Sequence, residues 1–132
     1  MASANACVPA TPWLKRYSRK GPRGTWGIAF DGANIWVTNQ NSNSVTKLRA
    51  NDGAVLGQFG VGGNPVGVAF DGANIWVANG GSSNVTKLRA SDGALQGTFP
   101  VVGGGSGGPQ GIAFDGANIW VTSSGNGTVG KL

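Results

Sequence analysis

The octapeptide FDGANIWV occurs three times in this chain without a change, beginning at Phe30, Phe70 and Phe114. The first two copies start 40 residues apart and the last two 44 residues apart. A second segment, VTKLRA, recurs in the same phase at 45–50 and 85–90, and VGKL at 129–132 is a truncated third copy. Repeats of about 40 to 50 residues are typical of solenoids and propellers. The fold therefore depends on which elements one repeat contains.

One repeat unit contains four runs with strand character, separated by turns and loops. In the first unit the runs are GIAF, IWVTN, VTKLRA and AVLGQFGV, at 27–30, 35–39, 45–50 and 54–61. The Asp-Gly pairs in the turns at 31–34 and 51–53 indicate hairpins, because glycine tolerates a positive φ without a Cβ clash. Glycine fills 25 positions and the apolar residues keep no helical period, which argues against helices. The unit is therefore predicted to be a four-stranded antiparallel meander.

The second strand of each unit is apolar on both sides. Side chains alternate along a strand, so Ile35 and Val37 face one side and Trp36 faces the other. Burying both faces requires a neighbouring sheet on each side, as the radially packed blades of a propeller provide. We therefore predict an all-β fold, a β-propeller of four-stranded antiparallel blades with about three blades per chain. The tryptophans at the strand centres are expected to form the inter-blade core, with a ligand-stacking ring as the alternative: Trp36, Trp76 and Trp120.

The repeats occupy residues 24–132 and divide into units at about 24–63, 64–107 and 108–132, the last one truncated. The net charge of +5 comes entirely from residues 1–23, because the later bases and aspartates balance. Two interpretations of this basic tail stay open. Residues 13–18, WLKRYS, alternate apolar and basic side chains, as an outer strand does, and could complete the third unit of a neighbouring chain. The alternative is a disordered tail, and this short basic run is not expected to bind nucleic acid.

The pattern G-[IV]-A-F-D-G-x-N-I-W-V resembles the NHL and YVTN propeller repeats, in the wider group with SMP-30/gluconolactonase-like and streptogramin-lyase-like proteins. Resemblance to a gluconolactonase implies a divalent metal held by carboxylate and amide side chains, with glutamate prominent. Resemblance to a streptogramin lyase implies a histidine that acts in acid–base chemistry. This chain contains neither glutamate nor histidine, so neither site carries over to it.

The remaining candidate groups for metal binding or catalysis have simpler structural roles. Each of the five aspartates precedes a glycine in a tight turn, where Asp commonly accepts hydrogen bonds from nearby backbone N–H groups. Cys7 is the only cysteine, so an intramolecular disulfide is impossible and no histidine accompanies it as a base. We expect no metal, no cofactor and no catalysis. No apolar run long enough to span a membrane and no secretory signal is visible, so we expect no membrane partner, and the compartment stays open.

The loops between the second and third strands are the candidate ligand-binding segments. They are uncharged and rich in amide and hydroxyl groups, which suits a sugar or a peptide, and binding residues concentrate on such loops. An ordinary polar surface is the alternative. The candidate residues are Asn39, Asn41, Asn43, Asn79, Ser82, Asn84, Ser123 and Asn126.

Three blades do not close a propeller, because rings usually contain about 4–8 blades. We therefore expect a homo-oligomer, with a dimer of six blades favoured and a larger ring or a filament as further outcomes. The predicted function is that of a noncatalytic scaffold, structural or binding a ligand or protein. The alternative is a fragment of a longer propeller enzyme, lactonase-like or lyase-like, whose catalytic residues lie outside this chain.

Overall fold

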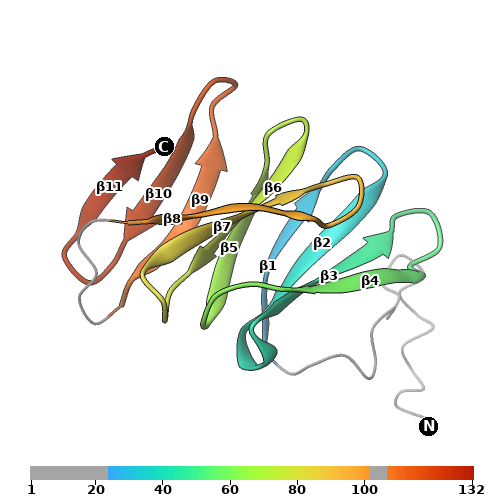
Figure 1. Ribbon diagram of the computed structural model, residues 1–132, viewed down its shortest axis with the longest axis horizontal. Coiled ribbons are helices and arrows are strands. Elements are labelled where there is room, and N and C mark those ends of the chain that lie inside the picture. The colour runs from blue at the N-terminus through green and yellow to red at the C-terminus, as the bar shows by residue number, and fades with distance from the viewer. Residues whose placement is uncertain (1–23, 102–106) are drawn as a thin grey trace, which may run out of the picture.

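The computed structural model describes residues 24–101 and 107–132, which form three antiparallel sheets and no α-helix (Figure 1). Blade 1 contains β1 (Thr25–Phe30), β2 (Asn34–Asn39), β3 (Ser44–Arg49) and β4 (Val55–Gly60). Blade 2 contains β5 (Pro65–Phe70), β6 (Asn74–Asn79), β7 (Asn84–Arg89) and β8 (Leu95–Pro100). Blade 3 contains β9 (Pro109–Phe114), β10 (Ile119–Ser123) and β11 (Thr128–Lys131). One turn of 3-10 helix, Gln40–Ser42, joins β2 to β3.

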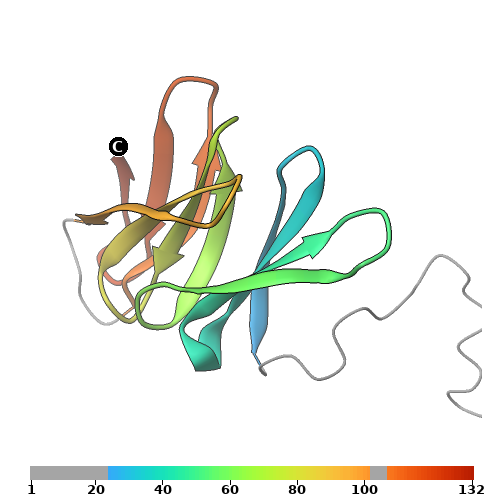
Figure 2. The same ribbon diagram turned by 45° about the vertical axis from the view of Figure 1, so that its right-hand side comes forward.

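The order of strands within each sheet follows the sequence, as expected for a meander. The inner strands β1, β5 and β9 pack beside one another, while β4 and β8 run across the outer side (Figure 1). These features confirm the predicted all-β fold and its propeller blades. The three blades form an open arc and not a closed ring (Figure 2). Blade 1 and blade 3 therefore each keep one face that no other described blade covers.

The register within the blades repeats along with the sequence. In blade 1 Trp36 pairs with Lys47 and Val37 with Thr46, and in blade 2 Trp76 pairs with Lys87. Directly paired residues of an antiparallel ladder place their side chains on the same face of the sheet. Tryptophan and lysine therefore share one face of the blade, whereas Ile35, Val37 and Leu48 of blade 1 occupy the other.

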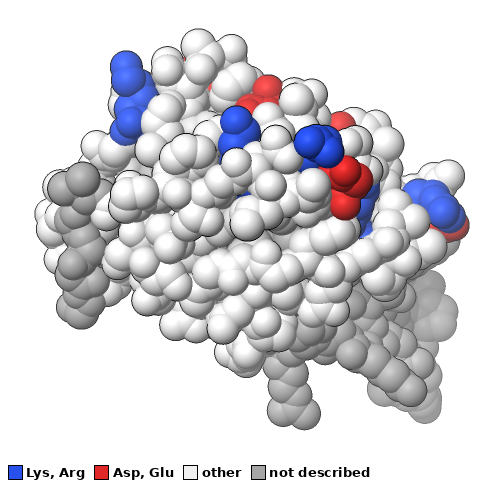
Figure 3. Space-filling model, viewed as in Figure 1, with Lys and Arg blue, Asp and Glu red and all other residues white. Residues whose placement is uncertain are grey.

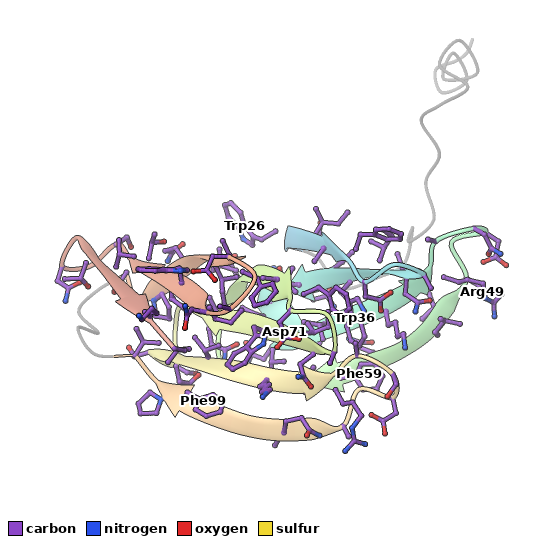
Figure 4. All side chains as sticks on the ribbon, turned by 90° about the horizontal axis from the view of Figure 1, so that it is seen from above. Trp26, Trp36, Arg49, Phe59, Asp71 and Phe99 are labelled. Carbon is purple, nitrogen blue, oxygen red and sulfur yellow. The ribbon has the colours of Figure 1, made fainter. Side chains whose placement is uncertain are left out.

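The core consists of two junctions between neighbouring blades. At the first junction Trp36 and Val45 of blade 1 pack against Ile75 and Val77 of blade 2. Phe59 of β4 packs on Trp36 with ring centroids 5.7 Å apart, and Figure 4 shows the two side chains next to each other. The second junction repeats this arrangement one blade further on, with Trp76, Ala78 and Val85 against Ile119 and Val121.

A close approach of two backbones accompanies the side-chain packing at each junction. A Cβ atom on Gly27 of β1 would lie 2.3 Å from the carbonyl oxygen of Val66 in blade 2. A Cβ on Gly67 of β5 would lie 2.4 Å from the carbonyl oxygen of Gln110 in blade 3. Such contacts are too short for any side chain, so glycine is required where the inner strands meet.

The basic tail and its proposed strand at 13–18 lie outside the described residues, as does most of the inserted Gly-rich segment at 101–108. In the described part of the chain, no helix has the length and apolar character needed to cross a membrane.

Candidate functional site

Charge is distributed unevenly over the described part of the molecule. The aspartates lie in the turns that join the first strand to the second and the third to the fourth, and these turns share one end of the blades. Figure 3 shows the acidic and basic side chains in the upper half of that view. The loops at the opposite end, between the second and third strands, carry no charged residue. One end of the blades therefore presents charged groups, and the other end presents uncharged amide and hydroxyl groups.

At the charged end, the aspartates of the DGAN turns hold both the turn and the neighbouring tryptophan. Asp31 Oδ1 accepts hydrogen bonds from the backbone N–H groups of Ala33 (3.0 Å) and Asn34 (2.7 Å). Its Oδ2 accepts a hydrogen bond from Nε1 of Trp36 at 2.7 Å. The same bonds recur in the other two units, at Asp71 and Asp115. The bonds to the backbone agree with the expected turn role, whereas the bond to tryptophan is a finding of the structure.

These hydrogen bonds determine the protonation of the turn carboxylates. Burial raises the pKa of Asp71, but the hydrogen bonds from Trp76 and from the backbone of Ala73 and Asn74 outweigh it, so the pKa lies below its usual value of 3.8. The pKa of Asp31 is lowered in the same way. The pKa of Asp115 is also lowered, chiefly by the hydrogen bond from Trp120. These groups are anions at neutral pH with their oxygen atoms engaged, which does not suit a general acid or base.

The free energy of unfolding is expected to fall as the pH is lowered through the acid range. A carboxylate with a lowered folded-state pKa stabilises the fold fully above its unfolded-state pKa, and this stabilisation is lost as the pH falls through the folded-state value. Denaturant unfolding at a series of pH values measures the slope. The Asp71→Asn variant is expected to show a smaller slope below the usual pKa of 3.8. An unchanged slope in this variant would contradict the role given to Asp71.

At the uncharged end, three of the eight candidate ligand residues are buried at the ends of strands, namely Asn39, Asn79 and Ser123. Asn39 is 2% exposed and Asn79 is 0% exposed. Each donates a hydrogen bond from Nδ2 to the hydroxyl of a threonine on the next strand, Thr46 or Thr86, at 2.8 Å. Asn39 belongs both to the strand predicted at 35–39 and to the ligand candidates, and in the structure Asn39 and Asn79 are the last residues of β2 and β6. They support the blade from inside.

The other candidate residues lie in or next to the loops, and most of them make local hydrogen bonds. Asn43 Oδ1 accepts from the backbone of Asn64, which ties the loop of blade 1 to blade 2. The remaining positions are as follows: Ser82 Oγ accepts from the backbone of Gly63, Asn84 Oδ1 from Asn79, and Asn126 Oδ1 from Thr128, while Asn41 is exposed. These bonds support the loops, and the ligand-binding role stays a prediction.

The uncovered face of blade 1 is an apolar surface. Ile28 is 70% exposed, whereas Val68, which occupies the same position in blade 2, is 8% exposed at the first junction. A groove on this surface is lined by Thr25, Ile28, Ile35, Val37, Leu48, Arg49, Ala50 and Gly53. We call Ile28, Ile35, Val37 and Leu48 the aliphatic face. Its counterparts in blade 2 receive Trp36 at the first junction.

The uncovered face of blade 3 carries the opposite half of a junction. Trp120 is 40% exposed, whereas Trp36 and Trp76 are 0% and 9% exposed. Val129 is 62% exposed, while its equivalents in blades 1 and 2 are buried. Lys131 Nζ lies 5.8 Å from the centre of the Trp120 ring, and the equivalent lysines lie 5.3 Å and 4.9 Å from the rings of Trp36 and Trp76. We call Trp120, Thr122, Val129 and Lys131 the aromatic face.

Lys47 shows how the aromatic side of a blade holds its neighbour. Lys47 is only 8% exposed, and its Nζ donates hydrogen bonds to the backbone carbonyl oxygens of Ala90 (2.8 Å) and Ser91 (3.2 Å) in blade 2. The ammonium group also lies 5.3 Å from the centre of the Trp36 ring. The sequence shows lysine within a strand, which is typical of a solvent-facing position. No feature of the sequence indicates that its partners lie in the next blade.

Within the described residues, the side chains of Cys, Asp, Glu and His form no group of three or more that could hold a metal ion.

The three sheets define this chain as part of a β-propeller, and comparison with known proteins supports that assignment. Neither a protein-family model nor a curated protein sequence matches the chain. Solved structures do, among them hydrazine synthase of Kuenenia stuttgartiensis, which is 26% identical with a TM-score of 0.69 over 85% of this chain and 33% of that one. Virginiamycin B lyase from Staphylococcus aureus is 20% identical with a TM-score of 0.70, over 82% of this chain and 36% of that one.

A third solved structure, the calcium-binding protein regucalcin from Agrobacterium tumefaciens, is 23% identical with a TM-score of 0.59, over 74% of this chain and 37% of that one. These matches confirm the predicted likeness to propellers of the SMP-30-like and streptogramin-lyase-like group at the level of the fold. The chain spans about a third of the length of each of these structures.

Proposed function

We propose that this chain is a noncatalytic propeller scaffold that assembles with further copies of itself through its aliphatic and aromatic faces. The observation that carries this proposal is the match between the two uncovered faces and the two halves of the first junction. Trp120 corresponds to Trp36, and Ile35 corresponds to Ile75, which packs against Trp36 inside the chain. The chain thus already contains one working example of the contact that two copies would make.

The area left uncovered favours association over a stable monomer. The two faces expose Ile28, Trp120 and Val129 by 70%, 40% and 62% of their surfaces. Burying apolar surface contributes about 25 cal/mol per Å² to the free energy of association. Because the aromatic face and the aliphatic face differ, the contact is head to tail, and such contacts close into a ring or continue as a filament. With three blades in each chain, two copies supply six blades, within the usual range of about 4–8.

The chemistry of the described residues supports a noncatalytic role. The sequence contains no histidine and no glutamate. The carboxylates of Asp31, Asp71 and Asp115 accept hydrogen bonds from the turns and the tryptophans, and their pKa values are lowered. The lysine at the first junction, Lys47, donates to backbone carbonyl groups. We therefore propose that these charged groups maintain the blades and act on no substrate.

A measurement of subunit number tests the proposal. Native mass spectrometry and sedimentation are expected to show a complex of two chains, or a larger ring or filament, whose population rises with protein concentration. Tryptophan fluorescence is expected to become less accessible to a soluble quencher on assembly, because Trp120 becomes buried. A folded monomer at high concentration, with no decrease in quencher access as the protein is concentrated, would contradict self-assembly.

A second candidate function is that of a segment of a longer propeller enzyme. The observation that favours it is the coverage of the matched structures, since the chain corresponds to about a third of each. In that case the aliphatic and aromatic faces would be covered by further blades of the same polypeptide, and catalytic residues would lie in those blades. The monomeric outcome of the experiment above would favour this second candidate.

A further inference from the structure

We propose that Lys131, Thr122 and Gly111 on blade 3 bind the backbone of blade 1 in a second copy of this chain, so that the copies join in a single head-to-tail register. Lys131 and Thr122 donate to the backbone carbonyl oxygens of Ala50, Asn51 and Trp26, and Gly111 allows the two backbones to approach closely. This inference rests on the proposed function, and it specifies polar contacts that apolar attraction alone does not require.

The first contact is that of the lysine. At the first junction Lys47 Nζ donates to the carbonyl oxygens of Ala90 and Ser91, in the turn between β7 and β8. Lys131 occupies the position of Lys47 in the repeat, and residues 50 and 51 occupy the positions of Ala90 and Ser91. The Lys131 side chain is exposed and lies over Trp120, as Lys47 lies over Trp36. Its ammonium group is therefore placed to donate to the same two carbonyl groups on blade 1 of another copy.

The second contact is that of the threonine. Thr38 Oγ1 accepts a hydrogen bond from the backbone of Gly27 at 2.7 Å and donates to the carbonyl oxygen of Val66 in blade 2 at 2.8 Å. Thr122 repeats the first half of this arrangement, since its Oγ1 accepts from the backbone of Gly111 at 2.9 Å. In the single chain its hydroxyl donates to the carbonyl oxygen of Gly111 over a longer distance, 3.4 Å. In the repeat, the carbonyl group that corresponds to that of Val66 belongs to Trp26.

The third feature is the glycine of each inner strand, which leaves room for the backbone of the next blade. At Gly27 and Gly67 an added Cβ would come within 2.3 Å and 2.4 Å of a carbonyl oxygen of the next blade. At Gly111 an added Cβ would meet only the hydroxyl of Thr122, at 3.0 Å, because no further blade of the described chain lies there. A methyl group at position 111 therefore fits the isolated chain once the Thr122 hydroxyl shifts slightly, but it would collide with the backbone of a second copy in the proposed register.

The polar groups also exclude the two symmetrical alternatives. If two aromatic faces met, the two Lys131 ammonium groups would approach each other without the carbonyl acceptors that the aliphatic side offers. If two aliphatic faces met, the carbonyl groups of Ala50 and Asn51 would be covered without a donor. Like charges brought together and buried polar groups left unpaired both cost free energy. Only the head-to-tail contact pairs donors with acceptors.

The test uses two variants that each disable one face. Gly111→Ala blocks the aromatic side and leaves the aliphatic face intact, while Ile28→Glu introduces a charge into the aliphatic face at an exposed position. Gly130→Thr is the matched control, because Gly130 faces blade 2 beside Val121 and the other two units have threonine there. Subunit number is measured by native mass spectrometry and sedimentation, with circular dichroism to confirm folding.

Each of the two variants alone is expected to be a folded monomer, and the control is expected to assemble as the unmodified chain does. Mixing the two variants is expected to give a complex with one chain of each, because one intact junction remains. This complex should be weaker than the unmodified assembly, in which closing the ring makes the second contact intramolecular. Assembly of either variant alone at the unmodified affinity, or a mixture that stays monomeric, would overturn the proposed register.

The lysine contact is tested by Lys131→Met, which retains an apolar stem over Trp120 and removes the donors. The association is expected to weaken at least about tenfold, because hydrogen bonds to charged groups are lost. Lys131→Arg keeps donors and is expected to restore most of the affinity. Equal affinity for the methionine variant and the unmodified chain would overturn the role of Lys131. If the unmodified chain itself is monomeric, the proposed function fails; if it assembles and these variants assemble equally well, only this inference fails.

Discussion

Replacing Trp36 by alanine is expected to lower the free energy of unfolding by about 3–5 kcal/mol, the usual range for removing a large buried aromatic side chain. The side chain is fully buried between blades 1 and 2 and packs against Phe59. The substitution also leaves a cavity at the junction and removes the donor to Asp31. Denaturant unfolding monitored by circular dichroism measures this loss, at a protein concentration low enough to keep the chain monomeric.

Trp120→Ala is the matched control for that experiment, because it removes the same residue from the same octapeptide. Trp120 is 40% exposed on the uncovered face of blade 3, so the substitution creates no comparable cavity in the monomer. Its cost in the monomer is expected to be less than half that of Trp36→Ala. Equal losses for the two variants would contradict the different environments that the structure gives to these tryptophans.

The second large effect is expected for Gly67→Ala, a substitution of a single methyl group. Its Cβ would lie 2.4 Å from the carbonyl oxygen of Gln110 and 3.0 Å from the Ile112 side chain. Because the closest atom belongs to the backbone of an inner strand, the clash can be relieved only by moving blade 3 away from blade 2. We expect a destabilisation of about 3 kcal/mol, at the upper end of the usual range for overpacking, measured by denaturant unfolding.

Gly111→Ala provides the comparison for Gly67→Ala, since both glycines occupy the same position in the repeat. Under monomeric conditions the change at Gly111 is expected to leave the free energy of unfolding within about 1 kcal/mol of the unmodified value, as is usual for surface substitutions. If both variants lose the same stability, the close approach of β5 and β9 is not what requires glycine at position 67.

The repeat pattern was sufficient to predict the strands and how the blades pack. The alternation of Ile35, Trp36 and Val37 assigned opposite faces to aliphatic and aromatic side chains, and the structure has them on opposite faces. The strand boundaries agree to within a few residues, because the Asp-Gly turns fix where each hairpin reverses. These features depend on side-chain alternation and on turn residues, both of which can be recognised within a few consecutive residues.

The contacts between blades could not be predicted in the same way. Lys47 and its acceptor on Ala90 are separated by 43 positions in the sequence, and the acceptor is a backbone carbonyl, which every residue has. Asn39 ends the strand predicted at 35–39, but its amide side chain is polar and the sequence does not show that it is buried. The hydrogen bond from Trp36 to Asp31 was not predicted either, because the hydrogen bonds within the turn were already a sufficient reason for an aspartate at this position.

The repeated register has a consequence for how the chain folds. β2 pairs with β3 through the same residues that join β6 to β7, from Asn34 opposite Arg49 and from Asn74 opposite Arg89. A hybrid in which β2 pairs with β7 would therefore form nearly the same ladder of side-chain contacts. The native pair closes a short loop, whereas the hybrid closes one about ten times longer, which costs about 2 kcal/mol more in chain entropy. Connectivity, and not side-chain recognition, determines which third strand each second strand selects during folding.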